Sequence, residues 1–395
     1  MSLLQVVAPP PAVPPERPPG GKTPVAPGAY AGTDACRPCH AAKVATYLST
    51  AHQKTSSLGT KETVAGRFDA GSNVLTTANP RLSFRMETRP DGLYQVALMA
   101  PLAGGAAPAP LRAERIDIVT GSGRKGQTYL FWKGEQLFEL PVSYWTDQHK
   151  WVNSPGFRNG DVNFTRVITP RCLECHATYV EHKAGTIGDY ERNGFVAGIG
   201  CEKCHGPGRD HIARQRSAAK APIAHDVVNT GRLPRERQLD LCATCHSGGT
   251  LATAPAFSYV PGEPLSDYFT RSPIAQATAA EVHGNQVALL RGSKCFQGSS
   301  TMTCSTCHDV HAPQRDVAAL ASKCLTCHKP EACGVFPKAG ARITTRCIGC
   351  HMPNSQSGVI TVTASSDSMR PSVRNHFIKV YPEESAAILK TLVAQ

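Results

Sequence analysis

The sequence predicts a mainly α-helical fold with much irregular loop, together with a small antiparallel β-insertion. Composition favours this class: only 41% of the 395 residues are hydrophobic, and 34 Gly with 31 Pro disfavour long regular elements. This composition supplies few apolar side chains for an ordinary hydrophobic core, so we expect another source of buried apolar volume. No run of about 18 apolar residues occurs, which excludes a membrane-spanning helix.

The first part of the chain is predicted to be a tether followed by a short helical segment. Residues 1–30 are rich in proline and are typical of an extended tether. Residues 31–77 form a first segment, in which we expect a helix at 38–57.

Residues 78–147 contain the strand signals. Period-two alternation at 81–87 and at 94–98 flanks a turn signal at 89–92, which predicts a hairpin. Further strands are expected at 115–120, 128–133 and 136–142, giving an antiparallel β-insertion of four or five strands. The insertion has no cysteine and no catalytic signature, so we expect a scaffold or docking surface.

Cysteine is the anomaly of this sequence. Fourteen of the 16 cysteines fall in Cys-x-x-Cys-His motifs. This spacing is typical of c-type haem attachment, in which two thiols add to the haem vinyl groups and the adjacent histidine ligates the iron. Zinc or thioredoxin-like sites would show one motif, or paired cysteines without the constant histidine. We therefore predict seven covalently bound haem c groups, on motifs one to seven: Cys36, Cys39, His40; Cys172, Cys175, His176; Cys201, Cys204, His205; Cys242, Cys245, His246; Cys304, Cys307, His308; Cys324, Cys327, His328; Cys347, Cys350, His351.

The motifs divide the chain unevenly. The first begins at residue 36 and the other six lie within 172–351. That region is too short to enclose each haem in its own pocket, so we expect stacked porphyrins to form the core. The six-haem domain is predicted to span 148–395, with short helices that include 235–246 and a C-terminal helix beginning near Pro382.

Eight histidines remain as candidates for the second axial position of each iron. His311 follows His308 by three residues, so it should bind a neighbouring haem instead. If residues 40–52 are helical, His52 lies about 18 Å along the axis from His40, too far to share its iron. The stronger candidates are His52, His211, His283, His311 and His376. Three others lie in polar surroundings that equally suit surface histidines: His149, His182 and His225.

Cys295 and Cys333 lie outside every motif. In an oxidising compartment, a leftover pair most often forms a disulfide, which would clamp the segment carrying motifs five and six. A free thiol or an unusual axial ligand is the alternative.

The formal net charge of +12 does not by itself indicate nucleic-acid binding. Haem propionates would offset much of it, and the basic cluster between residues 209 and 237 has few interleaved aromatics. Haem c attachment is completed outside the bacterial cytoplasm, so we expect a periplasmic or extracellular protein. Residues 1–30 show no export signal, so we expect either a start codon placed too late or a trimmed sequence.

The runs at 170–177, 200–208 and 302–309 resemble multihaem c cytochromes of the superfamily that contains the nitrifiers' tetrahaem electron carrier, hydroxylamine oxidoreductase and octahaem tetrathionate reductase. The resemblance covers 170–352 and 35–52, and implies closely stacked haems in a mostly helical core. This chain departs in having seven motifs rather than four or eight, and in lacking a Cys-x-x-Cys-Lys variant.

These observations predict an exported electron carrier that relays electrons through mostly bis-His haems between redox partners, such as other cytochromes or a quinol-linked donor. One alternative is an oxidoreductase acting on a small nitrogen or sulfur compound at one five-coordinate haem. Another is a subunit of a polymeric or multi-protein conduit.

Overall fold

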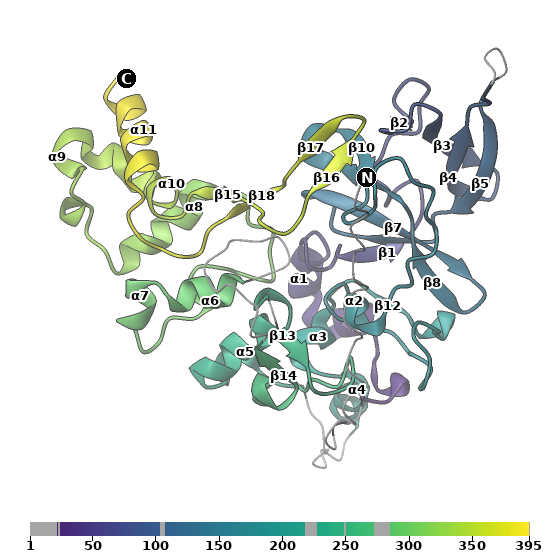
Figure 1. Ribbon diagram of the computed structural model, residues 1–395. Coiled ribbons are helices and arrows are strands. Elements are labelled where there is room, and N and C mark those ends of the chain that lie inside the picture. Colours follow the sequence, from purple (N-terminus) through teal and green to yellow (C-terminus); the bar gives the residue numbers. More distant parts are fainter. Residues whose placement is uncertain are drawn as a thin grey trace, which may run out of the picture.

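The computed structural model describes residues 22, 24–102, 107–217, 227–248, 250–271 and 285–394. Figure 1 shows two regions, with β-sheets on the right and short helices below and to the left. The α-helices are α1 (Arg37–Tyr47), α2 (Pro170–Glu174), α3 (Cys201–His205), α4 (Arg209–Arg216), α5 (Arg235–His246), α6 (Gln286–Arg291), α7 (Lys294–Gln297), α8 (Val317–Ser322), α9 (Phe336–Ala339), α10 (Cys347–His351) and α11 (Pro382–Val393). The 3-10 helices are η1 (Pro27–Ala29), η2 (Thr33–Cys36), η3 (Thr146–Gln148), η4 (Arg192–Gly194), η5 (Thr230–Arg232), η6 (Leu265–Asp267), η7 (Cys304–Thr306), η8 (Lys323–Thr326), η9 (Pro330–Ala332) and η10 (Gly340–Thr345).

Two antiparallel sheets form the β-region. One sheet has the order β2 (Val74–Thr76), β3 (Leu82–Arg89), β4 (Gly92–Met99), β5 (Ala109–Arg115). The other has the order β1 (Ser56–Leu58), β6 (Ile118–Thr120), β7 (Gly126–Lys133), β9 (Val142–Trp145), β10 (Lys150–Asn153), with β8 (Gln136–Glu139) paired to β7. The predicted hairpin is confirmed, because β3 and β4 pair from Leu82–Met99 to Arg89–Gly92.

The prediction of a mainly helical fold is wrong. Among the described residues 33% are helical and 23% are in strands, and the strand pairs are antiparallel. Strands also lie outside 78–147, in β1, β2, β10 and in four short pairs: β11 (Ala177–Tyr179) with β12 (Val196–Ala197), β13 (Thr250–Ala252) with β14 (Phe269–Arg271), β15 (Asn354–Gln356) with β18 (Ser372–Arg374), and β16 (Val362–Ala364) with β17 (Asp367–Met369). Strands of two or three residues are too short to show a period of two, so sequence reasoning missed them.

The helix predictions had mixed outcomes. Helix α5 begins and ends where the sequence indicated, and helix α11 begins at Pro382 as predicted. The helix expected at 38–57 ends at Tyr47. The hydroxyls of Ser49 and Thr50 donate hydrogen bonds to carbonyls three residues earlier, at 2.8 and 2.7 Å, and such bonds compete with helical propagation.

The largest side-chain core lies in the β-region. It contains Phe84, Met86, Tyr129 and Phe131, all at most 1% exposed, and its buried members lie between residues 64 and 164. Helices α8 to α11, which we call the C-terminal lobe, pack around a smaller cluster that includes Ile343 and Leu392. The region between residues 172 and 351 has several small apolar clusters in place of one large core.

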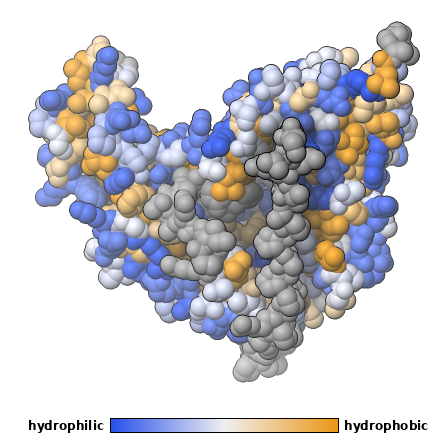
Figure 2. Space-filling model, viewed as in Figure 1, coloured by the Kyte–Doolittle hydropathy of each residue, from blue (hydrophilic) through white to orange (hydrophobic). Residues whose placement is uncertain are grey.

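The C-terminal lobe lies apart from the sheets, and Figure 2 shows a notch between them. Strand β16, between α10 and α11 in the sequence, reaches the β-region. There the side-chain amide of Asn153 donates a hydrogen bond to the carbonyl oxygen of Thr363 at 3.1 Å. None of the helices in the described ranges has both the length and the apolar character that crossing a membrane requires.

Candidate haem-binding cavity

One continuous cavity of about 3570 Å³ runs through the helical region. Every cysteine and histidine of the seven motifs lines it. A pocket for one small ligand usually measures about 300–1,000 Å³, so this cavity has room for several large cofactors. The motifs, scattered along the sequence, therefore share one space.

Short helical turns explain how each motif faces the cavity. Motif three forms α3, motif seven forms α10, and motif four is the last turn of α5. Residues three apart lie on one side of a helical turn, so both thiols of a motif can reach one cofactor while the next residue presents its imidazole.

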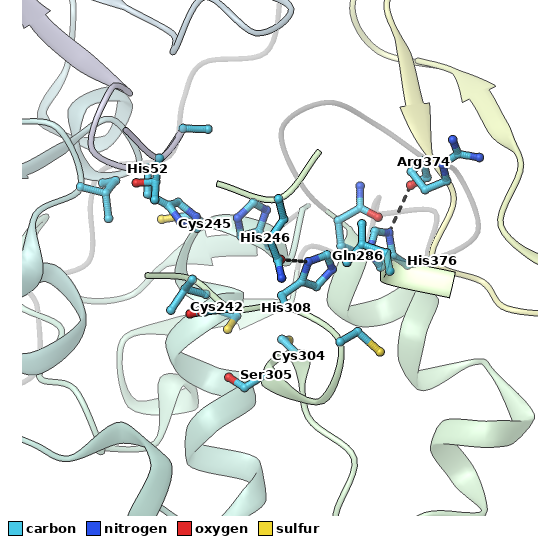
Figure 3. A pocket seen from close by; sticks show the side chains of 18 of the residues that line it. His52, Cys242, Cys245, His246, Gln286, Cys304, Ser305, His308, Arg374 and His376 are labelled. Carbon is cyan, nitrogen blue, oxygen red and sulfur yellow. Dashed lines mark hydrogen bonds between the residues drawn. The ribbon is translucent and has the colours of Figure 1, made fainter. Parts of the chain in front are cut away.

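Three motif histidines each face a second imidazole across the cavity. The ring centres of His246 and His52, of His205 and His311, and of His308 and His376 are each 6.2 Å apart. A metal–imidazole bond of about 2.0 Å on each side, with about 1.1 Å from ring nitrogen to ring centre, gives about 6.2 Å for two ligands of one ion. The spacing therefore fits one haem iron between each pair, and Figure 3 shows His52, His246, His308 and His376 in a row.

Backbone carbonyls orient several of these rings. The Nδ1–H groups of His205, His351 and His376 can donate to the carbonyl oxygens of Val228, Lys379 and Arg374, at 2.8, 3.0 and 3.2 Å respectively. A ring that donates through Nδ1 keeps the lone pair of Nε2 for a metal. Sequence reasoning could not find these partners, which lie two to 28 residues away.

Desolvation favours the neutral form of four of the facing imidazoles, those of His52, His246, His311 and His376. Desolvation, followed by the neighbouring His52, lowers the pKa of His246 to about 4. Burial also lowers the pKa of His52, His311 and His376. A neutral imidazole is the form that binds a metal, so the cavity favours the ligand-competent state.

The other candidate histidines differ in position. His211, on α4, lines the cavity, and burial lowers its pKa. His149 is an exposed residue beyond η3, and His182 packs its ring against Tyr190; neither lines the cavity. His225 and His283 lie outside the described residues.

Cysteines of different motifs come close together. Thiols of motifs one and three, two and four, four and five, and six and seven lie close enough to shift one another's pKa, in the pairs Cys36–Cys201, Cys175–Cys245, Cys242–Cys304 and Cys324–Cys347. Cys204 lies within electrostatic range of Cys242, and Cys307 within range of Cys324. The attachment points therefore adjoin one another throughout the cavity.

The expected Cys295–Cys333 disulfide is absent from the structure, where both thiols are free. Cys295, on α7, lies near Cys307 and Cys324. Cys333 instead packs in the C-terminal lobe with Ile343 and Cys350. The two thiols thus have separate neighbours, and both line the cavity.

The lining of the cavity is strongly basic. Thirteen Lys and Arg side chains line it, against four Asp and Glu. Each haem carries two propionates, so a basic wall is what several haems require. Cysteine pairs, facing imidazoles and surplus positive charge all fit haem c.

Comparisons with known proteins agree with this fit. The family model described as cytochrome c554 and c-prime matches residues 128–206, which contain motifs two and three. The C-type polyheme cytochrome OmcC of Geobacter sulfurreducens is 24% identical over 162 residues, which are 40% of this chain and 20% of the relative. This chain is thus similar to multihaem c-type cytochromes. Cytochromes of that type hold their haem c groups covalently.

One solved structure has a fold similar to that of this chain. The crystal structure of the outer cell wall cytochrome OcwA is similar with a TM-score of 0.54 at 18% identity, covering 91% of this chain and 81% of that one. The undecaheme cytochrome from the S-layer of Carboxydothermus ferrireducens reaches a TM-score of only 0.38 at 16% identity, covering 91% of this chain and 53% of that one. The OcwA likeness supports the β-rich fold. The curated match, in contrast, spans a fifth of OmcC.

Two glutamates inside the motifs of this chain hold neighbouring backbone, a role that the sequence did not suggest. The Glu202 carboxylate, 4% exposed, accepts hydrogen bonds from the amides of Ala31, Gly32 and Gly208 at 2.7 to 2.8 Å. Glu174 accepts from the amide of Phe257 at 2.8 Å. The sequence feature that could have indicated this role is the acidic residue between the two cysteines of motif two and of motif three.

Backbone contacts place the loop that carries His52. The carbonyl oxygen of His52 accepts a 2.9 Å hydrogen bond from the amide of Ile199. Gly198 has a φ of +68°, and its amide donates to the Ser56 hydroxyl at 2.9 Å. A Cβ on Gly198 would lie 2.1 Å from the carbonyl oxygen of Gln53, so only glycine allows this approach.

Gly198→Ala should therefore displace the His52 loop. We expect a loss of about 2–4 kcal/mol in the free energy of unfolding, from left-handed strain plus the clash, and partial loss of low-spin haem signal. Chemical denaturation and electron paramagnetic resonance (EPR) would measure both. Gly358→Ala is the control, since nothing lies within 4 Å of its Cβ position. Equal behaviour of the two variants would contradict this account.

Proposed function

We propose that this cytochrome is an exported electron relay that holds seven haems in one cavity. The observation that carries the proposal is that the complete set of seven motifs lines a single continuous space. When bound, haem c supplies one-electron redox chemistry, while the chain supplies ligands, charge and burial. Mainly histidine ligation would set lower potentials than histidine–methionine ligation.

The structure supports particular residues for holding the cofactors. The fourteen motif cysteines would form the thioether links, and the seven motif histidines would bind one side of each iron. On the other side, His52 would serve motif four, His311 motif three and His376 motif five, because of the 6.2 Å ring separations. His211 is a fourth candidate in the cavity.

Cysteine contacts support an order for the attachment sites. Motif one adjoins three, three adjoins four, four adjoins five, five adjoins six, and six adjoins seven. Motif two adjoins four. The sites would thus form one row with a branch at motif four, ending in the C-terminal lobe.

The relatives support the proposed location and partners. Their names place OcwA in the outer cell wall and the undecaheme cytochrome in an S-layer. We infer that this cytochrome works outside the cytoplasm, exchanging electrons with other redox proteins, and that it derives from the superfamily containing hydroxylamine oxidoreductase and octahaem tetrathionate reductase. The β-region would be the scaffold or docking surface, within a longer conduit if copies assemble.

Removing one central haem should cut the relay. We expect protein attached to an electrode by a C-terminal tag to show seven electroactive haems. The variant Cys242→Ala/Cys245→Ala should lose the mass of one haem, that of motif four. About three haems, those of motifs five to seven, should nevertheless remain in electrical contact with the electrode. Film voltammetry would count them.

The matched control removes a terminal site. Cys36→Ala/Cys39→Ala should lower both the haem mass and the electroactive count by one. A mass below seven haems in the parent protein would overturn the cofactor count. Equal electroactive counts in the two variants would overturn the proposed order.

A further inference from the structure

The end of the chain that forms the C-terminal lobe carries positive charge without carboxylate partners. From residue 315 onward the sequence has ten Lys and Arg against five Asp and Glu. Among the described residues, none of these ten cations forms an ion pair. Many cations of the β-region do, for example Arg85 and Arg89 with Glu87, and Lys125 with Asp147. The lobe therefore presents a local positive potential that its own acids do not cancel.

The cations of the segment 315–346 divide into two groups by their relation to the haem cavity. Three of them line the cavity, where they can neutralise haem propionates: Arg315, Lys323 and Lys329. The other three are exposed and lie outside the cavity lining, and we call them the outer cations: Lys338, Arg342 and Arg346. A role as propionate partners does not account for the outer cations.

The outer cations lie between the last two attachment motifs. Lys338 is on α9 and Arg342 is on η10. Arg346 directly precedes Cys347 of motif seven, and α9 packs against η9, which begins two residues after His328 of motif six. Figure 1 shows α9 at the outer end of the lobe, away from the sheets. A partner bound at the outer cations would therefore adjoin the end of the proposed row of haems.

Short side chains beside the outer cations favour a folded partner. Pro337 and Ala341 are exposed, and they immediately precede Lys338 and Arg342. A flexible anionic polymer needs only positive charge, whereas a folded protein must also fit closely against the surface that it binds. Small residues between the cations allow that close approach.

We propose that the outer cations dock a one-electron redox protein with an acidic face. This inference rests on the proposed relay, and it adds the place of exchange and the charge of the partner. In each exchange one ferrous haem of the lobe becomes ferric and the partner gains that one electron, or the reverse when the partner is the donor. Attraction between the opposite charges speeds association, and dissolved salt weakens it.

Stopped-flow oxidation of the full-length, haem-loaded protein tests the proposal. The protein is reduced with dithionite, freed of excess reductant, and mixed with less than one equivalent of oxidised plastocyanin, an acidic blue-copper protein. We expect its second-order rate constant to fall at least about tenfold as ionic strength rises from about 0.01 to about 1 M, since the Debye length then shrinks from about 30 to about 3 Å. Mitochondrial cytochrome c, a basic acceptor, should show no such fall.

Charge reversal at the outer cations locates the docking surface. At low ionic strength, Lys338→Glu/Arg342→Glu/Arg346→Glu should lower the rate constant with plastocyanin at least about tenfold and raise that with cytochrome c. Lys338→Gln/Arg342→Gln leaves the residue beside motif seven unchanged, and it should give a smaller loss in the same direction. Mass spectrometry counts the haems, so that only chains with seven are compared.

The matched control changes the net charge equally but elsewhere. Lys61→Glu/Lys133→Glu/Lys150→Glu alters exposed cations that lie outside the cavity lining and form no ion pair with the described residues. These positions lie in or beside the β-region, so the rate constant with plastocyanin should fall by less than about threefold.

Three results would overturn the proposal. Equal losses in the outer-cation variant and in the control would assign the effect to net charge. A parent-like rate in the outer-cation variant, together with a lost affinity for heparin, would show that the surface holds an anionic polymer instead. A parent protein that passes electrons to neither acceptor would contradict the relay itself, whereas the first two results leave the relay intact.

Discussion

His52→Ala should convert one haem of the oxidised, haem-loaded protein from low to high spin. His52 faces His246 at 6.2 Å and lines the cavity half-buried, so alanine removes a ligand that the surrounding residues do not replace. The reduced variant should bind one further equivalent of carbon monoxide. EPR and a carbon monoxide titration would measure the two changes.

His52→Met separates ligation from structure. A thioether can occupy the same position, so we expect low spin to be retained with a higher reduction potential for one haem. His182→Ala is the matched control, because that ring packs on Tyr190 outside the cavity. An unchanged spin state in His52→Ala would disprove the assigned pairing.

Glu202→Ala should cause the largest loss of stability among single substitutions near the motifs. The carboxylate is buried and accepts three backbone hydrogen bonds, from two residues just before motif one and one just after motif three. Its removal leaves three amide donors without a partner, at about 1–3 kcal/mol each and less than additively. We expect a loss of about 3–5 kcal/mol in the free energy of unfolding by guanidinium titration.

Glu202→Gln should lower the free energy of unfolding by about half as much. Its amide oxygen still accepts hydrogen bonds, whereas its amide nitrogen faces other donors. Glu331→Gln, at an exposed position on η9, should change stability by less than about 0.5 kcal/mol. Mass spectrometry must show equal haem loading in every variant. A loss for Glu202→Ala no greater than that for Glu331→Gln would refute the proposed clamp.

Local patterns predicted part of the fold well. The hairpin of β3 and β4 was readable because eight-residue strands show full alternation around the turn at 89–92. Helices α5 and α11 were readable from their first turns. The end of α1 was not, since Ser49 and Thr50 return their hydroxyls to the backbone. The distance argument for His52 therefore assumed a helix that ends five residues earlier.

The sequence by itself determined the attachment chemistry, because two thiols and an imidazole must lie within five residues to hold one haem. Only the tertiary structure decided which histidines face one another. His52 and His246 are 194 residues apart in the sequence but face each other, and backbone contacts with Gly198 and Ile199 hold the loop that carries His52. Contacts between distant segments, which no local pattern encodes, decide three features of this structure. They are the pairing of the histidines, the separate neighbours of Cys295 and Cys333, and the short strands.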